Sequence, residues 1–261
     1  PIIFGWLAVR GELRTGWKTQ NHMGHFWRGL VGTSAMGLGF TGLGLLPLPE
    51  VTAIGYAAPI FVVIFAAMFL NEQVRAFRLS AVALGMIGVV IVLSPRLSVG
   101  VAMNVSESVH PARLGLWAFL AALAHVFVRK LVATESTAAI VFWFTITSSV
   151  MALLTLPWGW VIPSGPVALM VIMAGLLGGV GQICLTSSYR YADASLVAPF
   201  DYVSMILALA IGYFVFDEVP TGTMLIGAGI VITAGVLIIL RERWLGLQRA
   251  QQRKATGTVG N

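Results

Sequence analysis

Asp201 combines residue type and position in a way that could support chemistry, because it lies inside an apolar stretch of the sequence, two residues after Pro199. A carboxylate there could hold a proton or a cation, or it could pair structurally with a neighbouring helix or with Arg190. Pro199 has no backbone N–H to donate, so a carbonyl one turn earlier loses its usual partner. Asp201 and Pro199 are therefore candidates for substrate binding or proton coupling.

Two further polar residues lie within apolar stretches. His125 lies deeper than the inner end of its stretch, where it could couple proton movement or serve as a neutral, hydrogen-bonded core histidine. Gln182 begins a polar stripe that continues through Thr186 to Ser188. Such a stripe could line a path for a solute or form hydrogen bonds between packed helices. Both residues are candidates, with the packing interpretation open for each.

Two tyrosines near prolines complete the candidate set. Tyr56 lies three residues before Pro59, and Tyr202 lies three residues after Pro199. Aromatic rings beside a helix irregularity could line a cavity and stack on a bound molecule, or they could be ordinary tyrosines at a membrane interface. The sequence leaves both interpretations open for Tyr56, Tyr202 and Pro59.

Other apparent motifs carry no chemistry. Residues 37–42 match a dinucleotide fingerprint letter for letter, but no strand precedes them and they lie in an apolar helix, so glycine packing explains them. The single cysteine, Cys184, excludes an intramolecular disulfide and a multi-cysteine metal site. No nucleophile elbow, nucleotide-binding motif or pair of catalytic carboxylates is found. The sequence thus predicts neither an enzyme nor a cofactor.

The elements that position these residues are apolar helices. Apolar residues make up 58% of the chain and charged residues 10%, whereas soluble domains carry about 25% charged residues. About 20 helical residues cross a hydrocarbon core, which predicts an all-α membrane protein with eight full spans. The spans are expected at 26–46, 51–70, 77–95, 112–133, 137–157, 166–187, 194–215 and 222–241. Residues 1–9 form a half-helix stub.

Basic residues set the expected orientation. Of the 16 lysines and arginines, 14 fall in alternate connecting segments, and the other two are Arg96 and Arg113. Those segments are 10–28, 71–78, 129–136, 188–193 and 241–261. By the positive-inside rule they are cytoplasmic, which predicts a multi-pass protein of the cell inner membrane with a cytoplasmic C-terminus. The net charge of +6 then reflects topology, so the lipid bilayer and not nucleic acid is the expected partner.

A segment that occurs twice gives the domain organisation. LPLPEVTAIGYAAPIF leads to FLNEQV in the first half, and YADASLVAPFDYV leads to VFDEVP in the second. Glu72 and Glu218 each end an apolar helix, where capping or hairpin pairing is the expected role. The second half holds five helices, and an odd number inverts a duplicated unit in the membrane. We expect a truncated first repeat at 1–95, an external loop at 96–111, a second repeat at 112–241 and a basic cytoplasmic tail at 242–261, with disorder expected at 248–261. About one and a half helices are expected before Pro1.

The paired motifs resemble the two EamA repeats of the drug/metabolite transporter superfamily. The resemblance rests on Pro59 with Glu72 and on the YADASLVAPFDY and FDEVP segments. It implies ten helices, a central cavity lined by the first four helices of each repeat, and a peripheral fifth helix. It also implies transport of metabolites, amino acids or drugs.

These observations lead to a functional hypothesis. We expect a secondary-active transporter that moves a small metabolite, amino acid or drug-like compound, in either direction, by alternating access around a site between the repeats. A membrane-embedded enzyme or a non-transporting membrane scaffold is the alternative. The sequence leaves a homodimer open and does not choose the substrate.

Overall fold

The computed structural model describes residues 1–45, 55–72, 76–97, 111–216, 219 and 221–257. These residues form α-helices joined by short connections and 3₁₀ turns, with no strand among them, which confirms the all-α prediction. The elements are α1 (Ile2–Val9), α2 (His22–Leu45), α4 (Ala58–Phe69), α5 (Ala76–Leu97), α6 (Pro111–Leu131), α7 (Thr137–Leu154), η1 (Leu156–Trp158), α8 (Gly165–Tyr191), α9 (Ala194–Val197), η2 (Ala198–Tyr202), α10 (Val203–Phe216) and α11 (Gly222–Gly257).

The helices group into two compact units. The first contains Pro1–Glu72 and Val105–Val197, and the second contains Gln73–Asn104 and Ala198–Asn261. Each unit combines segments from both halves of the sequence. The division by contacts therefore differs from the division by sequence repeats, and the repeat boundaries at 95 and 112 stay a prediction.

In the first unit, α2 packs along α6 and α7, while α6 also contacts α4 and α8. Glycine permits the close approach of α2 to α7, because a Cβ atom at Gly29 would lie 2.6 Å from the side chain of Thr147. One turn further along α2, Thr33 and Ser148 share a hydrogen bond of 2.8 Å. A small apolar core under α1 contains Ile3, Leu7, Ala138 and Val141.

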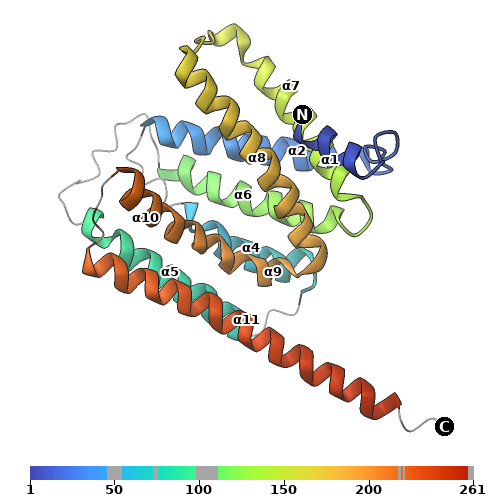
Figure 1. Cartoon of the computed structure of the whole chain (residues 1–261), viewed down its shortest axis with the longest axis vertical. Coiled ribbons are helices and arrows are strands. Elements are labelled where there is room, and N and C mark those ends of the chain that lie inside the picture. The colour runs from blue at the N-terminus through green and yellow to red at the C-terminus, as the bar shows by residue number, and fades with distance from the viewer. Residues whose placement is uncertain (46–54, 73–75, 98–110, 217–218, 220, 258–261) are drawn as a thin grey trace. The chain divides into compact units, whose positions relative to one another are not determined.

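In the second unit, α5 and α11 lie side by side (Figure 1). Gly88 allows this contact, since a Cβ atom there would lie 2.8 Å from the carbonyl oxygen of Gly227. The helix α11 continues to Gly257, so the expectation of a disordered segment is wrong for residues 248–257. The segment is rich in Arg, Gln, Ala and Lys, which have high helix propensity and extend a helix that has already started.

Every apolar stretch expected to span the membrane contains helix in its described part. By length and hydropathy, two of the described helical segments could each cross a bilayer alone, Thr137–Trp158 and Gly165–Tyr191. Shorter apolar helices cover Ala58–Phe69, Ala76–Ile91 and Gly222–Leu237. The number of crossings and the inverted repeat stay predictions.

Candidate functional site

A buried arginine lies within the helices of the first unit. Arg28 is six residues into α2 and only 3% of its surface is exposed. Its guanidinium carbon lies 3.9 Å from the centre of the Phe144 ring on α7, and its Nη2 donates a hydrogen bond of 3.3 Å to Oε1 of Gln182 on α8. The sequence places Arg28 at the end of a cytoplasmic segment, whereas the structure buries it among three helices.

The charge of Arg28 is not neutralised by the described part of the chain. No described carboxylate forms an ion pair with it, and its buried Nε and Nη1 atoms have no hydrogen-bond acceptor. Its two partners, an aromatic face and a carboxamide, are both neutral. Burial of an isolated ion costs several kcal/mol of folding free energy. A charge retained among apolar helices therefore indicates a functional role, because it does not stabilise the fold.

Further buried polar groups lie on α8, on the face that carries Gln182, and on α6. On α8, Gln182, Thr186 and Tyr189 share one face, because they are four and three residues apart. Thr186 Oγ1 and Nδ1 of His125 are buried without a hydrogen-bond partner. The His125 ring lies 5.7 Å from that of Tyr189, and the charge of Arg28 acts on both side chains.

We call Arg28, His125, Phe144, Gln182, Thr186 and Tyr189 the Arg28 cluster. It brings together two candidates that the sequence named separately, His125 and Gln182. Sequence reasoning missed Arg28 itself, although a charge so near the start of an apolar helix was a signal.

The remaining candidates lie elsewhere. Tyr56 and Pro59 are buried at the start of α4 in the first unit. In the second unit, Pro199, Asp201 and Tyr202 lie in η2, where the helix changes from α to 3₁₀ and back to α. The Tyr202 ring is buried against Gly85 of α5, and the backbone oxygen of Asp201 accepts a hydrogen bond of 2.6 Å from Ser204.

Glu72 caps the start of α9, which confirms its expected capping role. Its carboxylate accepts hydrogen bonds from the backbone N–H groups of Ala194 at 2.9 Å and Ser195 at 3.0 Å. The Ser195 hydroxyl donates a third at 2.7 Å, and Arg129 Nε a fourth at 3.4 Å. Arg129 also binds Asp193 at 3.1 Å, so the end of α4, α6 and the start of α9 are tied together. The equivalent Glu218 lies outside the described residues.

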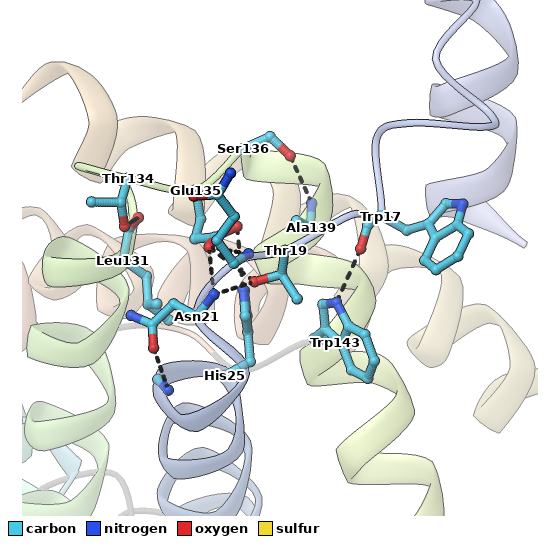
Figure 2. A network of polar contacts seen from close by, with 12 residues as sticks. Trp17, Thr19, Asn21, His25, Leu131, Thr134, Glu135, Ser136, Ala139 and Trp143 are labelled. Carbon is cyan, nitrogen blue, oxygen red and sulfur yellow. Dashed lines mark hydrogen bonds and ion pairs between the residues drawn. The ribbon is translucent and has the colours of Figure 1, made fainter.

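A second buried carboxylate joins the loop before α2 to the turn between α6 and α7 (Figure 2). Oε1 of Glu135 accepts hydrogen bonds from the Thr19 hydroxyl at 2.9 Å and from the backbone N–H groups of Gln20 and Asn21, both at 3.1 Å. Its Oε2 lies 3.6 Å from Nε2 of His25. The Ser136 hydroxyl caps α7 by accepting from the Ala139 N–H. This network therefore links the segment before α2 to the turn between α6 and α7 within the first unit.

The Glu135 network predicts acid sensitivity. Burial raises the pKa of this carboxyl, but hydrogen bonds from Thr19 and Gln20 and the nearby His25 outweigh burial and hold it below the ordinary value of 4.5. A lowered folded-state pKa contributes stability above the unfolded value, and this stability is lost as pH falls through the folded value. We expect the melting temperature to fall more steeply below about pH 4.5 in the wild type than in Glu135→Gln. Parallel slopes for the two proteins would contradict this.

Comparison with known proteins agrees with the helical architecture. The EamA-like transporter family model matches residues 1–94 and 114–241. The S-adenosylmethionine uptake transporter of Rickettsia felis is 29% identical over 87% of this chain and 74% of the relative. The riboflavin transporter of Rhizobium johnstonii is 29% identical over 83% of this chain and 71% of the relative. The pseudopaline exporter CntI of Pseudomonas aeruginosa strain UCBPP-PA14 is 26% identical over 81% of this chain and 72% of the relative.

A solved crystal structure shares the fold with a TM-score of 0.75, at 18% identity, over 92% of this chain and 83% of that one. The family model covers most of the sequence, and these relatives carry metabolites across membranes. The protein therefore belongs to the EamA-like transporter family of membrane proteins.

Proposed function

We propose that this protein is a secondary transporter of a small metabolite in the cell inner membrane, working by alternating access. The observation that carries the proposal is the Arg28 cluster: buried polar atoms without partners, inside apolar helices of a chain from a transporter family. Intramembrane ionisable groups usually mark a solute path, because their burial is costly.

Helix packing supports an inverted repeat. Matching the repeats by sequence order pairs α1 with α7, α2 with α8, α4 with α9–α10, and α5 with α11. Three of these counterpart pairs are in contact, namely α1 with α7, α4 with α9, and α5 with α11. The contact of α2 with α7 also has its counterpart in that of α8 with α1. Contacts between counterpart helices are expected when two copies of a unit are related by a two-fold axis. Rocking of one repeat against the other would then expose the site to each side of the membrane in turn.

Orientation follows the distribution of basic residues. We propose that residues 10–27, 129–136 and 241–261 face the cytoplasm, while Arg28 at the end of the first segment is buried. In a Cys184→Ala background, cysteines at Arg249 and Thr134 should resist an impermeant thiol reagent in intact cells, and one at Ser164 should react. Strong labelling of the Arg249 position from outside would reverse the proposed orientation.

Counterflow in liposomes tests transport directly. Purified protein is reconstituted with unlabelled S-adenosylmethionine or riboflavin inside, and uptake of the same labelled compound is followed. These two compounds are proposed from the relatives' substrates. Exchange above protein-free liposomes for either one supports the transporter, with a wider metabolite panel screened by the same assay. Correctly folded protein that exchanges none of the panel would favour the non-transporting scaffold.

A further inference from the structure

We infer that Arg28 is the binding residue for an ionised carboxylate on the transported molecule. This inference rests on the proposed function and narrows its substrate class to carboxylate-bearing metabolites, which include S-adenosylmethionine and exclude riboflavin, so counterflow of riboflavin would contradict it. The carboxylate would lie in the Arg28 cluster, between α2, α6 and α8. It would accept hydrogen bonds from the Nε and Nη1 groups of Arg28.

The first argument is the missing counter-charge. Arginine presents one N–H on Nε and two on each terminal nitrogen, and it is always charged. In Arg28, the described chain supplies an acceptor to Nη2 only, the Gln182 oxygen at 3.3 Å. Arg190 offers a direct contrast, since its Nε binds the Thr137 hydroxyl at 3.1 Å and its Nη2 binds the carbonyl oxygen of Glu135. Arg190 thus finds acceptors within the chain, and Arg28 lacks them at two nitrogens.

The second argument is the direction of approach. Phe144 covers one face of the guanidinium, with 3.9 Å from Cζ to the ring centre. The unpaired N–H groups lie in the plane of the guanidinium, so an anion must approach at its edge. A planar carboxylate bound in that plane makes short, charge-assisted hydrogen bonds.

The third argument is the balance of charge. Gln182, Thr186 and Tyr189 are uncharged acceptors or donors, and Arg28 supplies a single positive charge. A monoanion neutralises that charge, whereas a phosphate dianion would leave an excess negative charge buried among the helices. Thr186 Oγ1 and His125 Nδ1, both buried without partners, are further groups that could bind the same molecule.

Matched arginine variants provide the test. We would measure melting temperatures of the purified chain, in a buffer with chloride as its only anion, against acetate, acetamide and inorganic phosphate. S-adenosylmethionine and its decarboxylated form, both of which are cations, make a second pair that differs in the presence of the carboxylate. For the wild type we expect a melting temperature that rises with acetate and S-adenosylmethionine, and little response to the uncharged or decarboxylated partners or to phosphate.

Arg28→Met should abolish the response to the carboxylates, with affinity at least about tenfold weaker, which corresponds to 1.4 kcal/mol. Its ligand-free melting temperature should equal or exceed that of the wild type, because an uncompensated charge has been removed. Arg190→Met should lower the ligand-free melting temperature, because it removes satisfied hydrogen bonds, and should keep the carboxylate response. Thr186→Val, which removes only a hydroxyl, should fold and show a weakened response.

The inference would be overturned if acetate and acetamide raised the melting temperature of the wild type equally, or if the response to acetate survived in Arg28→Met. A ligand-free melting temperature of Arg28→Met as low as that of Arg190→Met would also overturn it. A stronger response to phosphate than to acetate would replace the carboxylate with a phosphate group. Failure of the proposed function would look different, since counterflow would be absent while the binding pattern remained.

Discussion

Replacing Glu72 with glutamine is expected to lower the free energy of unfolding by about 3 kcal/mol, the cost of removing one partner from a buried charged network. The carboxylate is 7% exposed and holds two backbone N–H groups of α9, the Ser195 hydroxyl and Arg129. A carboxamide has only one oxygen acceptor, and its NH₂ group would face N–H donors. Arg129 would keep only Asp193 as its counter-charge, and the start of α9 would lose its capping carboxylate.

Reversible unfolding in mixed dodecyl sulfate micelles measures this change. Glu12→Gln is the matched control, because Glu12 pairs with Arg10 at 3.3 Å on an exposed surface, where such pairs contribute less than about 1 kcal/mol. Ser195→Ala should lie between the two, since it removes one of the four hydrogen bonds. If Glu72→Gln unfolds like Glu12→Gln, the capping network does not stabilise the fold.

Replacing Asp201 with asparagine is expected to abolish transport or to remove its pH dependence, with near-normal folding. The substitution keeps the shape of the side chain and removes its charge. Asp201 lies in the 3₁₀ segment after Pro199, where the α-helical hydrogen-bond pattern is interrupted. A carboxylate in such a place can bind a proton or a cationic group during the transport cycle.

Transport rates between about pH 5 and 8 measure the effect in liposomes. Asp193→Asn serves as the control, because Asp193 is an acid outside the apolar helices that pairs with Arg129. Its rate and pH profile should stay close to those of the wild type. A wild-type profile in Asp201→Asn would leave Asp201 structural and make His125 the next residue to change.

Much of the helical framework could be predicted from the sequence. Apolar runs of about 20 residues are long enough to be recognised without any knowledge of their neighbours. The capping role of Glu72 could also be predicted from the local sequence, since this acid ends an apolar helix just before a turn. Its partners at residues 194 and 195 were not local, because they depend on how α4 meets α9.

The cluster could not be assembled from the sequence. Counting charges by segment assigns Arg28 to the cytoplasm, because hydropathy records the boundary of an apolar run and not the direction of a side chain. Its partner Gln182 is 154 residues away. Likewise, the polar composition from residue 248 onward suggested a disordered segment, while the helix propensity of residues 248–257 extended α11 to Gly257.

The capping of α9 by Glu72 also sets an order of events during biosynthesis. Glu72 is synthesised 122 residues before the backbone group of Ala194 that it binds. At about 5–20 residues per second, Glu72 is synthesised roughly 6–24 s before its partner. The interval between the synthesis of Arg28 and that of Gln182 is longer still, because 154 residues separate them. Until residues 182 and 194 have been synthesised, Arg28 and Glu72 must therefore be solvated by lipid headgroups, water or the insertion machinery.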